Sequence, residues 1–344
     1  MKAIGAVVVV LAVTGAVGMA QADITIETVP VGNPGNAADS RGYGAVAYEY
    51  NIGKYEVTAE QYTAFLNAVA KTDTYGLYDS GMGDSSAFGY GCQITRHGTS
   101  GSYTYDFSGR PSGTEADWAN RPVNYVSWGD AARFANWLTN GQGNGSTETG
   151  AYDLNGAMTD AELMAVVAPS AAQRETWSTG AKPYFLLTSE NEWHKAAYHD
   201  KTAGLAAVYY DCPTSSNSIP SNDLTNPDGG NNANFYQSGY TIGSPYYRTP
   251  VGEFELSDSP YGTFDQGGNV WEWNDARVSG PYRGQRGGDF DTPRQALRAW
   301  YHYTVGEPSV EYSRVGFRIV VIPEPATLSL LALGGLAMIR RRRR

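Results

Sequence analysis

The stretch Ser259–Val320 constrains the fold of this chain more than any other part. It carries four short strings in order, GNVWEW, RGGDF, LRA and GFR, and all but LRA combine glycine with an aromatic residue. Glycine permits the positive backbone angles of tight turns and the close approach of neighbouring backbones. The whole chain shares this character, with 41 glycines, 25 tyrosines and only 17% charged residues. This composition favours a loop-rich fold with aromatic packing over a helical bundle.

Four helices are predicted where a Ser or Thr is followed three residues later by Gln or an acidic residue, the capping-box pattern. In the first two, apolar residues then recur at i, i+3, i+4 and i+7, which gives each helix one buried face. The predicted N-caps are Thr58, Ser127, Thr159 and Ser189, and the third helix is expected to extend through Val167.

Short β-type runs flank these helices. They lie at 46–50 leading into 53–57, at 285–290, at 295–303 and at 315–321. Two long stretches, 72–119 and 217–244, show no clear period, and loops of that length are usually functional or insertions. We expect the part between the two chain ends, about 300 residues, to form one large domain.

These strings together resemble the formylglycine-generating enzyme, or sulfatase-modifying factor, family. Three more of its motifs precede GNVWEW in the family's order: KYEVTxxQY, RPVNYVSWxDA and LxSExEWxKAA. The likeness extends over about Ile52 to Val320, with a departure at Thr188, where the family commonly has proline. The resemblance implies a mixed α+β fold of C-type-lectin-like architecture, as a single domain with much irregular backbone.

Active members of that family oxidise a cysteine of a sulfatase to formylglycine, and they use two cysteines that follow the glycine pair. The matching positions here are Thr292 and Leu297, and Asp289 replaces a serine that is usual after the pair. Cu(I) prefers soft sulfur ligands, and exchange with a substrate thiol requires a thiol on the enzyme. We therefore expect no catalytic residue and no copper in this chain.

Other chemistries find little support in the sequence. A related branch of these domains uses iron held by several histidines, but the four histidines here form no H-x-x-x-H pattern and are interpreted as structural or surface residues. The GGDF string at 287–290 resembles part of a cyclic-dinucleotide signature, but its context predicts a turn. The histidines are His97, His194, His199 and His302.

The resemblance also implies a structural calcium ion in the loop before and within GNVWEW. Its ligands here would be Asp265, Gly268, Val270 and Glu272, a mixture of carboxylates and backbone carbonyls that suits Ca²⁺. The alternative is that Glu272 forms a local ion pair and no ion binds. A second calcium site of the family would need an aspartate where this chain has Gly243.

Several aromatic residues near these motifs are candidates for a recognition groove, because aromatic side chains make good binding anchors. We expect most of them to belong to the core instead. The candidates are Trp271, Trp273, Trp300, Tyr301 and Tyr303.

The sequences of both chain ends are typical of targeting segments. Residues 1–22, with Lys2, an apolar run and Ala20-Gln21-Ala22, are typical of a secretory signal peptide, with a membrane anchor as the alternative. Residues 323–344 combine Pro-Glu-Pro, an apolar stretch and five arginines, which resembles a PEP-CTERM sorting signal. That resemblance implies recognition and cleavage by an exosortase after transient membrane association. A permanent C-terminal anchor is the alternative.

Residues 23–322 form the predicted sulfatase-modifying-factor-like domain. Without both ends the chain has 19 basic and 34 acidic residues, a net charge of −15, which disfavours binding to nucleic acid or anionic lipid. Its two cysteines, Cys92 and Cys212, could form a disulfide outside the cytoplasm or stay as buried thiols.

Our interpretation is an exported, non-catalytic protein of the bacterial envelope, surface or extracellular matrix, with a peptide or polysaccharide ligand. One alternative is an oxidoreductase of the sulfatase-modifying factor type that acts on protein cysteine by an altered mechanism. A purely structural matrix component is another.

Overall fold

The computed structural model describes residues 23–86, 89–225 and 227–322, so the predicted signal peptide and the sorting tail lie outside it. Two four-stranded sheets, ordered β1-β2-β10-β5 and β8-β7-β6-β9, and the hairpin β3-β4 organise the described part. The strands are β1 Thr28–Val31, β2 Tyr50–Gly53, β3 Thr95–His97, β4 Thr104–Asp106, β5 Tyr184–Leu187, β6 Trp271–Arg277, β7 Arg283–Arg286, β8 Tyr303–Gly306, β9 Val315–Phe317 and β10 Ile319–Ile322.

All four predicted helix starts are confirmed, and each is closed by a capping box in which side chain and backbone bond reciprocally. The third helix ends two residues earlier than predicted. Two short helices, α2 and α5, were not predicted from the sequence. The helices are α1 Ala59–Val69, α2 Glu115–Ala119, α3 Trp128–Thr139, α4 Asp160–Ala165, α5 Ala171–Trp177 and α6 Glu190–Tyr198, with 3-10 turns η1 Ser80–Gly83, η2 Lys201–Ala203 and η3 Arg294–Leu297.

The strand predictions need four corrections. The run 285–290 is a strand only in its first two residues, since β7 covers Arg283–Arg286 and ends before the glycine pair. The run 315–321 is not one strand, because it divides at Arg318 into β9, parallel to β6, and β10, antiparallel to β2 and β5. The run 295–303 is wrong as a strand, since Pro293 opens the 3-10 turn η3 and β8 begins only at Tyr303. The predicted runs 46–50 and 53–57 are replaced by one shorter strand, β2, which covers Tyr50–Gly53.

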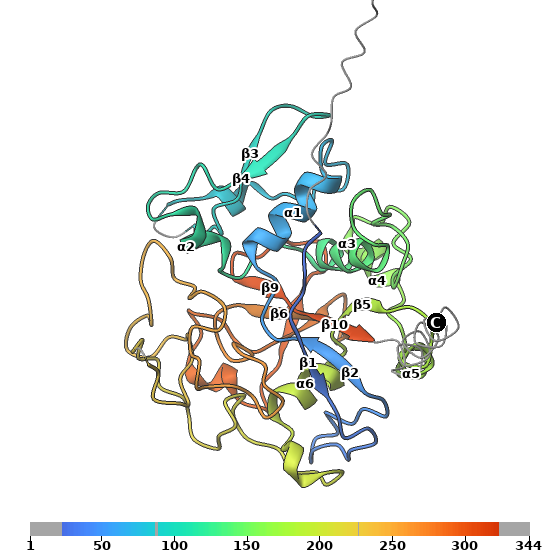
Figure 1. Cartoon of the computed structure of the whole chain (residues 1–344), viewed down its shortest axis with the longest axis vertical. Coiled ribbons are helices and arrows are strands. Elements are labelled where there is room, and N and C mark those ends of the chain that lie inside the picture. The colour runs from blue at the N-terminus through green and yellow to red at the C-terminus, as the bar shows by residue number, and fades with distance from the viewer. Residues whose placement is uncertain (1–22, 87–88, 226, 323–344) are drawn as a thin grey trace, which may run out of the picture.

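An aromatic core joins the first helices to the sheets. In Figure 1, α1 and α3 lie above strands β9 and β10, and α6 lies below them. The rings of Tyr62, Phe65, Phe134 and Phe317 contact one another at centroid distances of 5.3 to 6.4 Å, and all four side chains are fully buried. Edge-to-face contacts of this kind add to the area that the rings bury. The core thus positions β9 and β10, the two strands on either side of Arg318 in the GFR string.

A buried ionic network ties α5 and α6 to β6. Arg174 pairs with Glu192, at 2.7 Å, and with Asp275, and its side chain is entirely buried. Tyr152 donates its hydroxyl to Asp275 at 2.9 Å, and Tyr48 donates to Glu192 at 2.7 Å. One guanidinium is thus shared by two buried carboxylates, and each carboxylate also accepts a hydrogen bond from a tyrosine hydroxyl.

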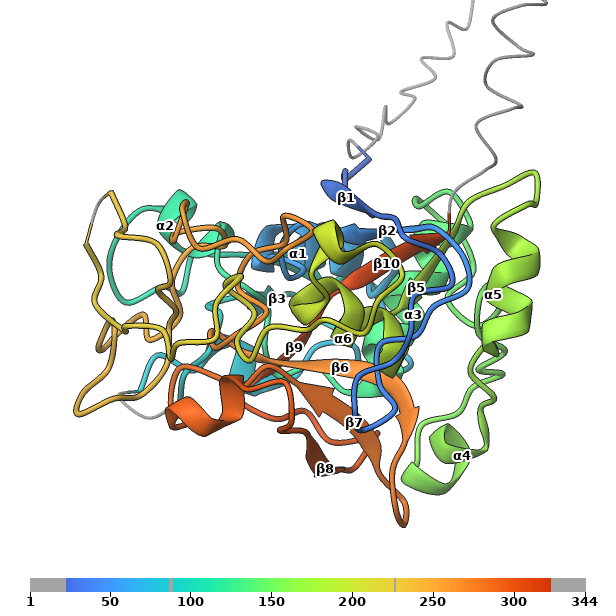
Figure 2. The same ribbon diagram turned by 90° about the horizontal axis from the view of Figure 1, so that it is seen from below.

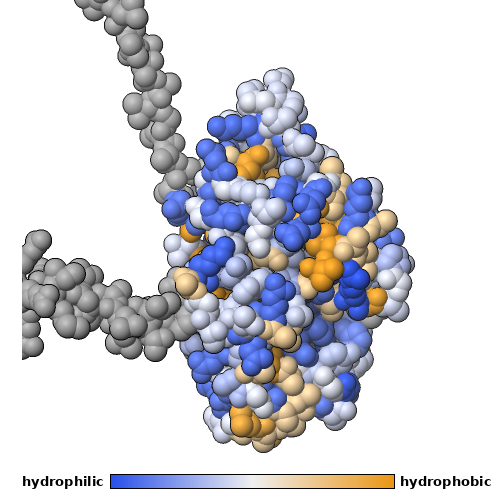
Figure 3. All heavy atoms as spheres, turned by 90° about the vertical axis from the view of Figure 1, so that its right-hand side faces the viewer, coloured by the Kyte–Doolittle hydropathy of each residue, from blue (hydrophilic) through white to orange (hydrophobic). Residues whose placement is uncertain are grey.

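The surface around α5 shows no continuous apolar area. Figure 3 looks at that side of the molecule, where hydrophobic residues form separate small patches between hydrophilic ones. Within the described ranges, no helix is both long enough and apolar enough to cross a membrane.

Candidate functional site

The glycine pair Gly287-Gly288 closes β7 and opens the loop that leads to η3, seen in orange at the lower left of Figure 2. Both residues have positive φ, +99° and +80°. A Cβ on Gly288 would come within 2.9 Å of the Thr292 hydroxyl and of the Ala296 methyl group. Only glycine fits here without displacing the following loop, so the turn predicted for the GGDF string is present.

Thr292 and Leu297 act as structural side chains in this loop. The Thr292 hydroxyl accepts from the Asp289 N–H at 2.8 Å and donates to the Asp289 carbonyl at 3.0 Å. Leu297 is fully buried. Neither position offers a group that could bind a soft metal or exchange with a thiol.

The two cysteines are unpaired and buried, so the structure contains the thiol alternative rather than the disulfide. Both lie far from the glycine pair in the sequence. The structure nevertheless brings Cys212 close, because the Ala299 N–H donates to the Asp211 carbonyl at 2.9 Å and Pro213 and Leu297 both pack against Gly267.

Burial makes both thiols poor nucleophiles. It raises the pKa of Cys212 to about 11 and also raises the pKa of Cys92. A thiol must ionise before it can attack a disulfide or bind a metal, and burial in apolar surroundings opposes this. At neutral pH the Cys212 thiol is therefore expected to be protonated.

A cluster of aromatic rings covers the outside of the same loop. Tyr240 lies 5.1 Å from Tyr247 and 5.2 Å from Tyr236, while Tyr90 lies 4.8 Å from Tyr247 and 5.1 Å from Phe290, measured between ring centroids. Tyr236 and Tyr240 are 42% and 38% exposed. We call these five residues the tyrosine cluster. Sequence reasoning missed it, because its members come from three segments with no regular period.

Charged residues border the tyrosine cluster. The Tyr240 hydroxyl donates to Asp291 at 2.9 Å, and Arg314 pairs with Asp291 at 2.6 Å and lies 3.6 Å from Asp289. Burial raises the pKa of Asp289 to about 6, against the opposing charge of Arg314. Because Arg314 is matched by carboxylates, the border of the cluster carries no excess positive charge.

The aromatic residues named from the sequence divide between core and surface. Trp271 and Trp273 are buried and Tyr301 is half-buried, whereas Trp300 and Tyr303 are 41% and 39% exposed. The four histidines do not form one cluster. His194 faces Asp39 at 3.3 Å, whereas His199 contacts the hydroxyl of Tyr261.

The carboxylates of the predicted calcium site have different surroundings. Glu272 is fully buried; it accepts from Arg318 at 2.8 to 3.2 Å and from the Trp193 indole N–H at 2.7 Å. Among the described residues, Asp265 accepts a hydrogen bond only from the Gly252 N–H, at 2.6 Å, and its φ is positive, +59°. Such a backbone angle is uncommon outside glycine and accompanies functional loops.

A further carboxylate, absent from the predicted ligand set, comes from the segment that runs beside the Asp265 loop, where the Phe264 N–H donates to the Lys54 carbonyl at 2.9 Å. Glu56, from the KYEVT string, is 2% exposed, and neither of its carboxylate oxygens has a hydrogen-bond partner. Burial raises the pKa of Glu56 well above its usual value, and the negative charge of Asp265 adds to this effect. Burial likewise raises the pKa of Asp265 to about 6.

These surroundings fit a hard cation beside Asp265 better than one beside Glu272. Among the described residues, the Glu56 carboxylate has no hydrogen-bond partner and Asp265 accepts one hydrogen bond, whereas Glu272 already bonds to Arg318 and Trp193. Within the residues that the structure describes, no three His, Cys, Asp or Glu side chains are grouped closely enough to hold a metal. The ligand set Asp265, Gly268, Val270 and Glu272 therefore stays a prediction.

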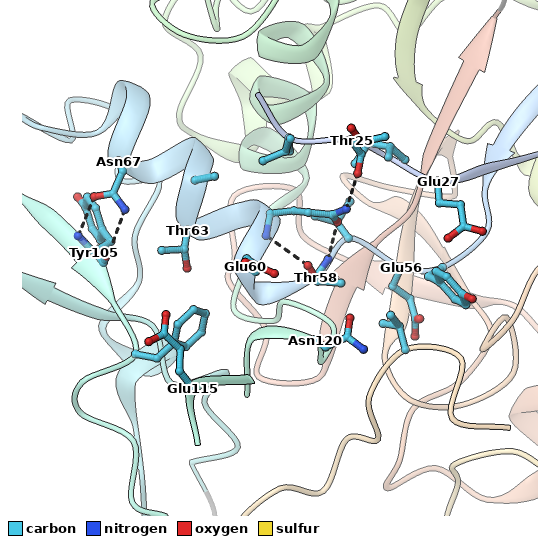
Figure 4. Close-up of a pocket in the computed structure, with 18 of the residues that line it drawn as sticks. Thr25, Glu27, Glu56, Thr58, Glu60, Thr63, Asn67, Tyr105, Glu115 and Asn120 are labelled. Carbon is cyan, nitrogen blue, oxygen red and sulfur yellow. Dashed lines mark hydrogen bonds between the residues drawn. The ribbon is translucent and has the colours of Figure 1, made fainter. Parts of the chain in front are cut away.

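Glu56 also lines an open pocket of about 760 Å³ between the N-terminal segment, α1 and the loop before α2. Six acidic residues line it, and among its described lining residues there is no Lys, Arg or His. Figure 4 shows Glu56 at the end of the pocket that also holds Glu27 and Asn120, while Glu115 and Tyr105 lie toward the other end. The pocket is separate from the glycine pair, since neither Thr292 nor Leu297 lines it.

Comparisons with known proteins agree with the motif order. A model of the sulfatase-modifying factor enzyme 1-like domain matches residues 24–322, and a PEP-CTERM protein-sorting motif matches residues 321–344. No curated protein matches the chain. The sorting motif implies recognition by exosortase machinery, and it points to export and to the envelope or surface of a bacterial cell.

Several solved structures are similar at low identity. CarF is 20% identical, with 86% of this chain and 98% of that chain covered and a TM-score of 0.49. Variable protein 1 of Treponema denticola is 18% identical, with 87% and 98% covered and a TM-score of 0.49. PvdO from Pseudomonas aeruginosa is 19% identical, with 80% and 82% covered and a TM-score of 0.42.

Proposed function

The chain belongs to the family of sulfatase-modifying factor enzyme 1-like domains, and we propose that it is an exported member that binds a surface polysaccharide and does not oxidise cysteine. One observation carries the non-catalytic part of this proposal. A threonine bonded to its own loop and a buried leucine occupy the positions of the family's two cysteines. Without sulfur there, Cu(I) has no soft ligand and a client thiol has no exchange partner.

The oxidoreductase alternative has no specific support. It would need a reactive thiol near the glycine pair, and the nearby Cys212 is buried with a raised pKa. A buried, protonated thiol neither binds a metal nor attacks a substrate disulfide at neutral pH.

The tyrosine cluster supports the binding role. Tyrosine rings present rigid, amphipathic surfaces that lose little conformational entropy when they bind a ligand. Exposed rings of Tyr236 and Tyr240 can stack on sugar rings, while the Asp291–Arg314 pair can bond to sugar hydroxyls. Because this pair is neutral overall and residues 23–322 are strongly acidic, a neutral polysaccharide is the preferred ligand over a polyanion.

A structural calcium ion in the Asp265 loop completes the proposal. In a fold with long irregular segments, a bound Ca²⁺ would hold the loop before β6 by replacing missing hydrogen bonds with carboxylate and carbonyl ligands. Its role would be to stabilise the protein, because the Gly268 N–H of the same loop donates to the Gly287 carbonyl at 3.0 Å and so connects this loop to the glycine pair.

Affinity electrophoresis through gels that contain neutral polysaccharide extracted from the bacterial surface tests the binding role. We expect the protein to be retarded, and we expect Tyr236→Ala and Tyr240→Ala each to weaken binding by about tenfold, the loss of one aromatic anchor. Tyr282→Ala, at the β6–β7 hairpin, is the matched control and should migrate like the wild type. Equal retardation of all four proteins would reject the tyrosine cluster as the binding surface.

The non-catalytic role has its own test. The purified protein is incubated with Cu(I), oxygen and a cysteine-containing peptide, and the peptide is examined for an aldehyde by mass spectrometry. We expect no aldehyde and no oxygen uptake above the copper control. Aldehyde formation that persists in Cys212→Ser and Cys92→Ser variants would establish an oxidase with an unrecognised mechanism.

A further inference from the structure

Glu56 is a buried carboxylate with no partner. It is 98% buried, and both of its oxygens lack a hydrogen bond, whereas most buried polar groups in proteins are bonded. The backbone around it is occupied elsewhere, since the Val57 N–H donates to Phe317 and the Val57 carbonyl accepts from Val123. The side chain therefore needs a ligand, a proton or a cation that the protein atoms do not supply.

The charges that face Glu56 are unbalanced. The segment that carries Glu56 lies alongside the segment that carries Asp265, because the Phe264 N–H donates to the Lys54 carbonyl at 2.9 Å and Arg318 donates to the carbonyls of both Gly53 and Phe264. Arg318 is committed elsewhere: Nε and Nη2 donate to Glu272, Nη1 donates to the Gly53 carbonyl at 2.8 Å, and Nη2 donates to the Phe264 carbonyl at 2.7 Å. Arg318 can neutralise one carboxylate, so Glu56 and Asp265 can both be ionised only if a further positive charge is present, and a divalent cation would supply it.

We propose that Glu56 is a ligand of the structural calcium ion and that the ion binds between Glu56 and Asp265, while Glu272 remains on Arg318. This inference rests on the calcium part of the proposed function and changes its ligand set. Two carboxylates offer up to four hard oxygen atoms, and Ca²⁺ completes its coordination with backbone carbonyls and water. A group of three acidic side chains is therefore unnecessary.

The surroundings favour entry of a cation. Glu56 borders the acidic pocket of Figure 4, whose lining includes Glu27, Glu60 and Glu115. A concave surface lined by carboxylates raises the local concentration of cations. Asp265 is held toward the site by its left-handed backbone and its bond to Gly252, so one carboxylate is already in place before an ion arrives.

Thermal melts and calorimetric titration of the purified full-length protein with CaCl₂ test the proposal. We expect calcium to raise the melting temperature by several degrees and excess chelator to reverse the shift. Glu56→Gln should reduce calcium affinity by about tenfold or more, because affinity depends on ligand charge. In chelator, however, Glu56→Gln should melt above the wild type, since an amide there carries no uncompensated charge. Glu60→Gln, an exposed residue of the same pocket, should retain the wild-type calcium response.

Two further variants separate the ligand sets. Asp265→Asn should lose most of the calcium shift, whereas Glu272→Gln should melt lower throughout but keep the shift. A full shift in Glu56→Gln together with none in Glu272→Gln would overturn the proposal in favour of the family's ligand set. No shift in the wild type would reject the calcium site altogether, and the polysaccharide and aldehyde tests would be unaffected by that result.

Discussion

Individual buried carboxylates in this protein differ in how they are neutralised. Glu192 and Glu272 pair with arginines, Glu56 has no partner, and Glu311 lies near another acid. Residue type alone does not distinguish these cases. For these side chains, the stability of the protein depends on their protonation state as well as on their packing.

Glu311 offers a direct test of this point. Burial, followed by the negative charge of Asp130, raises the pKa of Glu311 from 4.5 to about 7. The folded protein then keeps a proton that the unfolded chain has released, so the free energy of unfolding should fall as the pH rises from about 4.5 to about 7. Glu311→Gln removes this dependence and should be more stable than the wild type at pH 8 by on the order of 1 kcal/mol, discounted for partial exposure.

Urea unfolding at pH 4 and pH 8 measures the effect. The difference between Glu311→Gln and the wild type should vanish at pH 4, where both side chains are neutral. Glu175→Gln, on the exposed face of α5, should match the wild type at both values. An equal difference at both pH values would mean that packing, rather than ionisation, separates the variants.

At the scale of elements, each predicted helix is short and depends on its ends and its tertiary contacts. Isolated helices of this length are marginal in water, so propensity alone cannot hold them. The capping boxes define where α1, α3, α4 and α6 begin, and packing holds them in place. α5 lacks a capping box and has a single buried side chain, Arg174.

Arg174→Met should therefore detach α5 from α6 and β6. The variant would leave Glu192 and Asp275 buried without their shared cation, which typically costs about 3–5 kcal/mol. Urea unfolding would show the loss, and proteolysis would cut first within 167–183. Arg174→Lys keeps the charge and should recover part of the stability. If Arg174→Met unfolds like the wild type, the network contributes specificity and not stability.

At the scale of the whole molecule, the C-terminal strands close the fold. β10 pairs with β2 on one side and with β5 on the other, and β9 pairs with β6 in the second sheet. One run of eight residues, 315–322, thus belongs to both sheets. Because these pairings join distant parts of the chain, they form only when most of the chain is present.

Deleting 319–344 should abolish cooperative unfolding, because β2 and β5 lose the strand that lies between them and expose apolar edges. Deleting only 326–344 removes the tail and leaves β10 intact, so its unfolding transition should match that of the full chain. Circular dichroism during heating distinguishes the two. A sharp transition in the shorter protein would show that the remaining sheets are stable without β10.

The sequence predicted what depends on neighbouring residues. The four helix starts follow from bonds between residues three apart, and the turn at Gly287-Gly288 follows from the backbone freedom of glycine. The family followed from the order of several motifs, and the absence of its cysteines follows directly from Thr292 and Leu297.

Only the tertiary structure decided which distant groups meet. It divided the run 315–321 between two sheets, joined Asp211 to Ala299, assembled the tyrosine cluster from separate loops and brought the segment of Glu56 alongside that of Asp265. The neighbours that neutralise a buried charge or bond to a buried polar group come from distant parts of the chain. No local sequence pattern shows which of these parts meet in the folded protein. The sequence by itself therefore determined the family, the helix starts and the missing sulfur, while folding decided which carboxylates remain without a partner.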